Sequence, residues 1–315
     1  MISFPKRFAA AAAFLVTGCT VVPQADDASG ASAGPTEVVQ PIVTPAPTPT
    51  SMPAPQPSPP PAGPTTFVFD GALTQGGWLR GQAPDGTVSA RLGEQELALD
   101  EQGRFFAAFD RDAKNTSELV ASLADGRTVR SPVGVSPRDW DIEHINVARR
   151  PSGASEAFMR RRQPELDAIW DARTANSPSD GWQQDFIWPV TGRISGRFGS
   201  QRVYRGEPGS YHSGLDIAPG AGTPFVAPAD GVVTLAARDE FSLEGHLIIV
   251  DHGAGLNSAF LHASQIFVTE GQQVRQGERL GLVGATGRTT GPHLHWSIKW
   301  HLSRLDPLLF VGPMP

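Results

Sequence analysis

The residues best suited to chemistry lie in three short segments near the C-terminus, at positions 211–216, 260–263 and 292–296. Together these segments supply four histidines and one carboxylate that could act on a substrate: His212, Asp216, His262, His293 and His295. Two histidines, one carboxylate and one open position make up the ligand set of a catalytic zinc site. The other two histidines would then be free for acid–base chemistry beside the metal.

The spacing of these residues limits how they can meet. His212 and Asp216 are four positions apart, so on one strand their Cα atoms would be about 13 Å apart. A bend at Ser213 and Gly214 must bring them together, and glycine permits such a bend. His293 and His295 are two positions apart, so on a strand both point to one face. One of them could bind a metal while the other faces a substrate.

The donor types favour zinc as the cofactor. Imidazole and carboxylate ligands suit Zn²⁺ better than Mg²⁺ or Ca²⁺, which prefer oxygen shells. The chain has no His-Glu-x-x-His sequence, so the glutamate base of that motif is missing. His262 and His293 are the candidates for the base. His-x-His and His-x-x-x-Asp are weak signals singly, but they occur here together, with a histidine between them in a predicted strand.

The segment that must position these residues, 186–315, is rich in β-strand patterns. Apolar runs at 232–235, 246–250 and 280–283 predict strands, and glycine-containing turns separate them. No long helical period occurs in this segment. We therefore expect an antiparallel sheet or open barrel, which can hold metal ligands in fixed relative positions.

Two further segments precede it. Residues 65–135 contain short alternating apolar runs at 66–69, 87–92, 96–99 and 104–109, with turns at Asp85-Gly86 and Gln102-Gly103. They predict a small β-sandwich-like module that loosely resembles bacterial Ig-like domains, with a spacer or docking role.

Residues 136–185 predict a helical connector. Pro164 suits the first position of a helix, and Leu166, Ile169 and Trp170 follow at helical spacing. We expect this apolar stripe to pack on a neighbouring domain. The arginine run at 160–162 predicts a solvated face.

The N-terminus predicts export and anchoring. Lys6 and Arg7 precede an apolar run at 8–16 that is too short to span a bilayer, and Cys19 follows as the only cysteine. This pattern resembles a bacterial lipobox, which implies cleavage after residue 18 and lipidation of Cys19. The alternative is a secreted protein with a free thiol. Thr20 after the cysteine resembles the signal for sorting to the outer membrane.

Composition limits the remaining possibilities. The formal net charge is −6 and no long basic run occurs, so we expect no nucleic-acid partner. Residues 19–64 are rich in proline, which predicts a disordered, extended linker without a core. Such a tether could reach on the order of 100 Å from a membrane.

The segment from about 187 to 307 resembles the lysostaphin/LytM-type zinc metallopeptidases. The resemblance is carried by segments 192–199, 212–216, 224–233, 261–264, 270–274, 284–287 and 291–295. It implies an antiparallel β domain of duplicated-hybrid or barrel-sandwich type at 186–315. It also implies that His212, Asp216 and His295 ligate zinc. His262 and His293 would orient water, act as the base or stabilise the intermediate, and their division of roles stays open.

The resemblance also implies an activity. The family cleaves peptide bonds in peptidoglycan, whereas degenerate members lack ligands and activate amidases. No ligand is missing here, so we expect a zinc endopeptidase acting on stem-peptide cross-links, with a non-catalytic peptidoglycan-binding activator as the alternative. A lipoyl-type carrier would need a modified lysine on a hairpin tip. Lys299 is the only lysine after Lys114 and it follows His295, so the sequence argues against a carrier.

These expectations together define a setting in the cell envelope. The protein would be lipid-anchored at Cys19, in the outer membrane and facing the periplasm. Its partners would be peptidoglycan as the substrate, the membrane through the anchor, and other envelope proteins.

Overall fold

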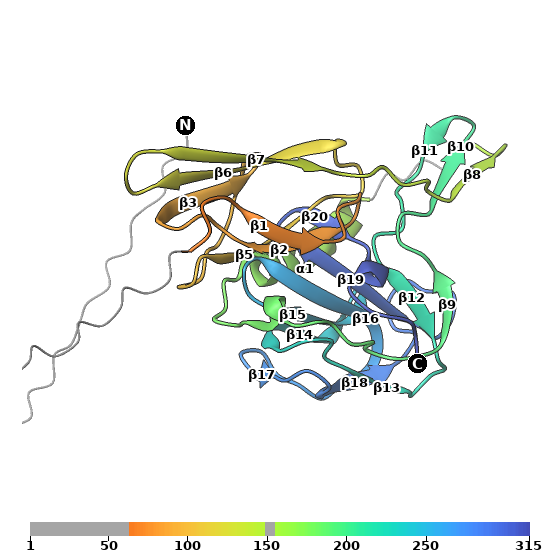
Figure 1. Cartoon of the computed structure of the whole chain (residues 1–315). Helices are drawn as coiled ribbons and strands as arrows, with labels where there is room; N and C mark the ends of the chain where they lie inside the picture. Colours follow the sequence, from red (N-terminus) through yellow and green to blue (C-terminus); the bar gives the residue numbers. More distant parts are fainter. Residues whose placement is uncertain (1–62, 149–154) are drawn as a thin grey trace, which may run out of the picture. The chain divides into compact units, whose positions relative to one another are not determined.

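The structure is a computed structural model that describes residues 63–148 and 155–315 of the chain. The predicted signal peptide, Cys19 and nearly all of the proline-rich segment lie outside the described residues. Among the described residues, no helix is long and apolar enough to cross a membrane. The described part is mainly β, with antiparallel sheets, and this confirms the predicted fold class (Figure 1).

Seven strands form two small sheets in the N-terminal half, with the orders β1-β2-β5 and β4-β3-β6-β7. The runs predicted at 87–92 and 104–109 correspond to strands, and Gly86 and Gly103 turn with φ of +75° and +73°, as predicted. The strands are β1 Val68–Gly71, β2 Trp78–Gln82, β3 Thr87–Leu92, β4 Gln95–Glu96, β5 Arg104–Ala108, β6 Thr116–Leu123 and β7 Thr128–Gly134.

The hydrophobic interior of these small sheets continues into the C-terminal half. Phe105 and Phe106 belong to the same buried cluster as Phe310. Trp78 packs on Phe310 with ring centroids 5.5 Å apart, and its indole N–H donates to the carbonyl of Leu309 at 2.8 Å. The residues before and after position 135 thus share one hydrophobic core. The domain boundary predicted at 135 stays a prediction.

A third small sheet joins distant segments. Strand β8 (Ile142–Ile145) pairs in parallel with β10 (Gln201–Tyr204), and β10 pairs with β11 (Glu207–Pro208). The segment predicted as a helical connector therefore also contributes a strand, which lies beside the chain leading to His212 (Figure 1).

Helix α1 (Glu156–Thr174) begins earlier than predicted. Ser155 caps it, and the Ser155 side chain accepts a hydrogen bond from the backbone N–H of Phe158 at 3.2 Å. The prediction that Pro164 starts the helix is wrong, because Pro164 lies inside it, where it removes one backbone donor and crowds the carbonyl four residues earlier. The cap and the packing of the helix outweigh that loss.

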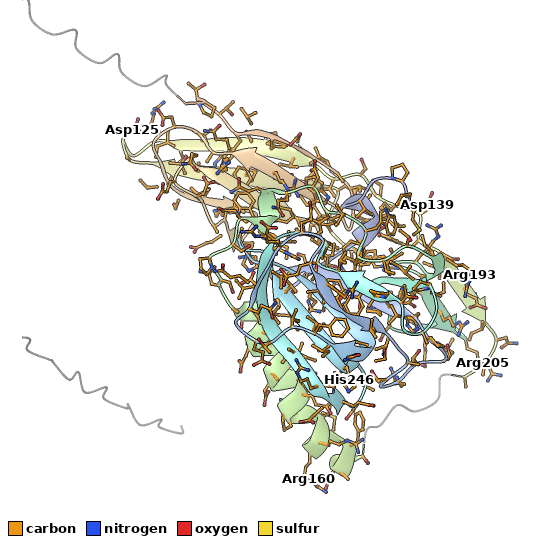
Figure 2. The ribbon with its side chains drawn as sticks, turned by 90° about the horizontal axis from the view of Figure 1, so that it is seen from below. Asp125, Asp139, Arg160, Arg193, Arg205 and His246 are labelled. Carbon is orange, nitrogen blue, oxygen red and sulfur yellow. The ribbon has the colours of Figure 1, made fainter. Side chains whose placement is uncertain are left out.

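The face that α1 buries also differs from the prediction. Leu166 and Trp170 are 38% and 57% exposed, whereas Ala172 is buried with Ile169 packed beside it. The predicted solvated arginine run is wrong for Arg162, which is buried. Figure 2 places α1 along the strands of the large sheet.

The large sheet has ten strands, with the main order β17-β14-β15-β16-β19-β12-β9. β13 pairs with β18, β18 also pairs with β16, and β20 pairs with β19. The strands are β9 Arg193–Gly196, β12 Leu215–Ala218, β13 Pro224–Val226, β14 Gly231–Phe241, β15 Gly245–Asp251, β16 Leu256–Ile266, β17 Gln273–Val274, β18 Arg279–Val283, β19 Leu294–Trp300 and β20 Ser303–Leu305, with the short helices η1 Gly181–Gln183 and η2 Pro307–Leu309.

The two faces of this sheet have different neighbours. Alternate residues of β19, including Leu294 and Trp296, point into the main core. The opposite face carries Leu247 and Ala259, which pack against α1. His295 lies on this second face by alternation. His295 and the helix therefore share one side of the sheet.

Candidate metal centre and active site

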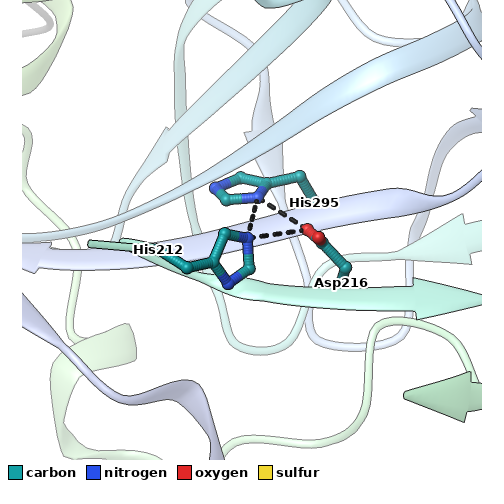
Figure 3. Close-up of side chains that lie close together, drawn as sticks. All are labelled: His212, Asp216 and His295. Atoms are coloured by element: carbon teal, nitrogen blue, oxygen red, sulfur yellow. Dashed lines mark hydrogen bonds and ion pairs between the residues drawn. The ribbon is translucent and has the colours of Figure 1, made fainter. Parts of the chain in front are cut away.

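Three of the predicted site residues converge at one point. Oδ1 of Asp216 lies 2.8 Å from Nδ1 of His295 and 3.1 Å from Nε2 of His212, and these two nitrogens lie 3.1 Å apart. Figure 3 shows the three side chains turned toward one another. One ligand atom from each residue lies within 4.8 Å of the others.

Strand pairing explains how two of them meet. Asp216 of β12 and His295 of β19 are direct partners in an antiparallel ladder, so their side chains stand on the same face. His212 precedes β12, and a bend at Gly214 turns it back over the strand, as the spacing predicts.

Two glycines allow the site to close this tightly. A Cβ atom at Gly214 would lie 2.6 Å from Nε2 of His295, and one at Gly196 would lie 2.5 Å from Oδ2 of Asp216. Both contacts are shorter than real Cβ contacts. Any larger residue at either position would push a side chain out of the group.

A backbone carbonyl orients the imidazole of His212. Its Nδ1 lies 3.0 Å from the carbonyl oxygen of Arg197, and a carbonyl only accepts, so Nδ1 carries the proton. With Nδ1 held in this way, Nε2, which faces Asp216 and His295, is the nitrogen that would offer its lone pair to a metal. A metal ligand whose second nitrogen is held in this way has a fixed tautomer.

The other two histidines lie beside this group. Their rings have centroids 4.9 Å apart, and Nε2 of His293 lies 3.6 Å from Oδ1 of Asp216. Nδ1 of His262 lies 2.8 Å from the carbonyl of Thr286, and Nδ1 of His293 lies 2.9 Å from the carbonyl of Gly291. In both rings Nε2 is thus left with the lone pair.

His262 has an unusual backbone. Its φ is +65°, in a region that costs a non-glycine residue about 1–3 kcal/mol. It lies within β16, as predicted, where the register with β15 shifts. Its N–H donates to the carbonyl of Glu244 at 2.9 Å, which holds the strained position. Such strain is concentrated at functional sites.

Burial and mutual charge set the protonation of the group. Burial acts against ionisation of Asp216, but hydrogen bonds from His212 and His295 outweigh it and hold the pKa of that carboxyl well below its usual range. Burial also opposes protonation of His212, yet the contact with Asp216 raises its pKa. Burial lowers the pKa of His295 and of His262, which favours their neutral forms.

The donor set fits zinc. In a tetrahedral site with bonds of about 2.0–2.1 Å, ligand atoms stand about 3.3 Å apart. The separations among the three donor atoms, 2.8 to 3.1 Å, are close to that value. Two neutral nitrogens and one anionic oxygen are also the ligands that a catalytic zinc takes from the protein.

A cleft of about 1020 Å³ opens onto the group. Its lining includes His212, Asp216 and Tyr211, together with Glu143 of β8 and Arg202 of β10. Arg202 donates to Glu143 at 2.7 Å. The cleft could admit a peptide next to the three donor atoms.

Some contributors to the site escaped prediction. Thr286 holds His262 through its carbonyl, and its hydroxyl donates to Ala263 O at 2.9 Å. Arg111, from the N-terminal half, contacts Tyr211 and the carbonyl of Gly199. Thr286 lies in one of the segments that carry the family resemblance, but no sequence signal links Arg111 to the site.

Known proteins resemble this chain in sequence and fold. The model of peptidase family M23 matches residues 210–307. The peptidoglycan DD-endopeptidase ShyA of Vibrio cholerae is 39% identical over 152 residues, which are 46% of this chain and 34% of ShyA. The cell division protein DipM of Caulobacter vibrioides is 32% identical over 199 residues, 63% of this chain and 30% of DipM. The chain spans about a third of the length of these relatives.

A solved structure extends the likeness beyond the metal group. A Pseudomonas aeruginosa chain assigned to peptidase M23 superposes with a TM-score of 0.59 at 30% identity, over 76% of this chain and 95% of that one. The residues matched by the family model, 210–307, include all five predicted site positions. The chain therefore belongs to peptidase family M23.

Proposed function

We propose that this protein is a zinc-dependent endopeptidase that hydrolyses stem-peptide cross-links of peptidoglycan. The observation that carries the proposal is the convergence of His212, Asp216 and His295 beside His262 and His293 on one face of the sheet. The name of ShyA supports the substrate, since that relative is a peptidoglycan DD-endopeptidase.

The histidine and aspartate side chains would divide the chemistry. His212, Asp216 and His295 would hold the zinc, which when bound supplies Lewis acidity for a peptide carbonyl and an acidified water. His262 and His293 each keep Nε2 free for a proton, because a backbone carbonyl occupies Nδ1. One of them would accept the proton of the attacking water, and one would deliver a proton to the leaving amine.

Release of dye from labelled sacculi tests this activity. The purified full chain should release dye, a chelator should stop the release, and added zinc should restore it. A chelator-insensitive release, or none at all, would contradict the proposal. Mass spectrometry of the soluble fragments would identify the bond that is cut.

A second candidate is a non-catalytic peptidoglycan-binding protein that activates amidases. The alignment with DipM, whose name is that of a cell division protein, is longer than that with ShyA, and this supports the second candidate. The complete set of histidines argues against it, because loss of a ligand is what would be expected of an inactive member. Binding to sacculi without release, together with stimulation of an added amidase, would support this candidate.

The setting in the envelope remains a proposal that rests on the sequence. Lipidation at Cys19 would tether the enzyme through the proline-rich segment, in the outer membrane and facing the periplasm. Replacing Cys19 with serine should move the protein from the membrane fraction to the soluble fraction. An unchanged membrane fraction would contradict the anchor.

The modular division also remains a proposal. Residues 65–135 would act as a spacer or docking module for envelope proteins, and residues 186–315 as the peptidase. The two proposed modules would share the buried core in which Phe106 packs against Phe310.

A further inference from the structure

Beyond His295, the outer face of β19 carries a row of polar and charged side chains. β19 pairs with β16 without a register shift, so Ser297 and Lys299 point to the same side as His295. They lie about 7 and 13 Å further along the strand. Arg304 of β20 is the direct partner of Lys299 on this face.

Arg173 of α1 reaches the same face. Its guanidinium donates to Asn257 Oδ1 at 2.6 Å and to Ser297 Oγ at 3.3 Å. We call Arg173, Lys299 and Arg304 the cationic row. Three positive side chains are thus gathered on the side of the sheet that holds the metal group.

The cationic row borders the cleft through Tyr211. Arg304 donates to the Tyr211 hydroxyl at 3.0 Å, and its guanidinium lies 5.2 Å from the centre of that ring. Tyr211 also lines the cleft next to His212. The side-chain hydrogen bonds of Arg173 and Arg304 therefore go to neutral partners, while Glu244 acts on Arg173, and Asp110 and Asp112 act on Arg304, through space.

The nearby carboxylates do not pair with Lys299. Asp110 accepts from the backbone N–H of Asp112 through Oδ1 and from the backbone N–H of Arg304 through Oδ2. Asp112 accepts from the guanidinium of Arg111 at 2.7 Å. Within residues 63–148 and 155–315, the Lys299 ammonium has no hydrogen-bonded or ion-paired partner.

The surroundings of Lys299 disfavour its positive charge, although the charge of Asp110 acts in the opposite direction. Burial, and then the positive charges of Arg173 and Arg304, lower the pKa of Lys299 to about 8. Like charges placed directly across a ladder, as Lys299 and Arg304 are, destabilise the fold. An anion bound between them would remove that repulsion.

We propose that the cationic row is a subsite for a carboxylate of the peptide substrate, with Lys299 and Arg304 as its main donors. An extended peptide advances about 3.3–3.6 Å per residue, so the carboxylate would be two to four residues from the bond at the metal group. Cross-linked stem peptides carry free carboxylates on such residues. This inference rests on the proposed function for its substrate and deepens it.

A purely structural role makes a different prediction. Arg173 lies in the last turn of α1, where a cation is favourable, and it fastens that helix to β16. If the row served only to dock α1 and Tyr211, the charge of Lys299 would be irrelevant to ligand binding. The test therefore centres on Lys299.

Binding is measured by titration calorimetry on the chelator-treated full chain, so that turnover is not required. The probes are a D-Ala–diaminopimelate cross-linked stem-peptide dimer with free carboxylates and the same dimer with those carboxylates amidated. We expect the acidic dimer to bind about tenfold more tightly, as charge-assisted hydrogen bonds predict. Lys299→Gln should abolish this preference, and Lys299→Arg should retain it.

Arg127→Gln provides the matched control, since Arg127 is an exposed arginine on the β6–β7 turn. It should keep the full preference. With zinc restored, Lys299→Gln should raise KM for the acidic dimer about tenfold and leave kcat nearly unchanged.

Two results would overturn the subsite. One is equal affinity of the wild type for both dimers, and the other is a loss of preference in Lys299→Arg equal to that in Lys299→Gln. A preference for the acidic dimer without any cleavage would support the subsite while contradicting the proposed function. Cleavage of both dimers with equal KM would support the proposed function and contradict the subsite.

Discussion

The five site residues acquire different properties from their surroundings, although four of them are the same amino acid. His295 turns Nδ1 toward Asp216, whereas His212 turns Nε2 toward it. His262 and His293 have Nδ1 tied to carbonyls, which leaves Nε2 for a substrate or water. His212 is tied in the same way, through Nδ1 to the carbonyl of Arg197, so the tie fixes only which nitrogen stays free. What separates His212 from His262 and His293 is that its free Nε2 lies 3.1 Å from Oδ1 of Asp216 and 3.1 Å from Nδ1 of His295.

Replacing one residue of each kind should separate metal binding from turnover. His212→Ala should lose both zinc and activity, because it removes one of three donors. His293→Ala should keep zinc and lose about 10²–10⁴-fold in kcat, the usual contribution of a proton-transfer group. Metal analysis and sacculus digestion measure the two effects. Equal loss of metal in the two variants would show that the assignment is wrong.

The residues of the site were largely predictable from sequence, but the hydrogen bonds that orient their imidazole rings were not. The types and co-occurrence of the four histidines and Asp216 predicted a metal group, and the family resemblance selected His212, Asp216 and His295 as its ligands. In His212, His262 and His293 the choice between the two ring nitrogens depends on the carbonyls of Arg197, Thr286 and Gly291. Those carbonyls belong to the backbone, so the side-chain sequence gives no sign of them.

Helix α1 shows how a single element connects the sheet to the site. Arg162 donates to both carboxylate oxygens of Glu244, at 2.6 and 2.7 Å, and also to Glu165. Glu165 in turn accepts from the backbone N–H and the hydroxyl of Ser242. Because the carbonyl of Glu244 holds the strained His262, this buried ion-pair network supports a proposed catalytic residue.

Breaking this network should weaken both the fold and the activity. Arg162→Met would leave Glu165 and Glu244 without their cation, at a cost of about 3–5 kcal/mol in the free energy of unfolding. Urea unfolding measures the loss, and kcat should fall with it. Arg160→Met is the control, since Arg160 is exposed and pairs weakly with Glu156. The triple variant Arg162→Met, Glu165→Gln, Glu244→Gln removes the unpaired negative charges as well and should recover part of the stability. If it is no more stable than Arg162→Met, unpaired charge is not the cause of the loss.

The elements differ in how well sequence pattern predicted them. The strand at 87–92 alternates along its length and was predicted, because alternation is a direct signal of a half-buried strand. The start of α1 was not, because Pro164 is a stronger local signal than Ser155, and the tertiary contacts of Arg162 decide the outcome. A buried arginine cannot be recognised in a run of three without its partner Glu244.

The N-terminal half and segment 186–315 are joined by more than a common core. Arg111 is buried, and its guanidinium stacks 5.0 Å from the ring of Trp140 and 4.5 Å from that of Tyr211. It donates to the carbonyl of Gly199 at 3.0 Å, and the N–H of Gly199 donates to the carbonyl of His212. An N-terminal side chain therefore braces the loop that presents a proposed zinc ligand.

Loss of this brace should reduce metal affinity as well as stability. Arg111→Ala should destabilise the chain by about 2–4 kcal/mol, from lost packing and unpaired acceptors, and should weaken zinc binding in a competitive chelator titration. Arg111→Lys should restore little, because lysine cannot make the planar stack between two rings. Zinc affinity equal to wild type in Arg111→Ala would contradict the bracing role.

The stability of the whole chain should also fall in acid because of a histidine far from the metal group. His252 is fully buried, with Nδ1 2.8 Å from the carbonyl of Asp230 and Nε2 2.9 Å from the hydroxyl of Ser258. Burial lowers its pKa from the ordinary 6.5 to about 4. Between these values the unfolded chain binds a proton that the folded chain does not.

The contribution of neutral, buried His252 to the free energy of unfolding is therefore complete above about pH 6.5. It is lost as the pH falls to about 4, and the loss is about 3 kcal/mol at most. Urea unfolding at several pH values between 7 and 4 measures it. His252→Gln should be less stable at pH 7 yet show a shallower decline than the wild type over this window. The exposed His144→Gln is the control; a shallower decline in that variant, or an unchanged one in His252→Gln, would refute the assignment to His252.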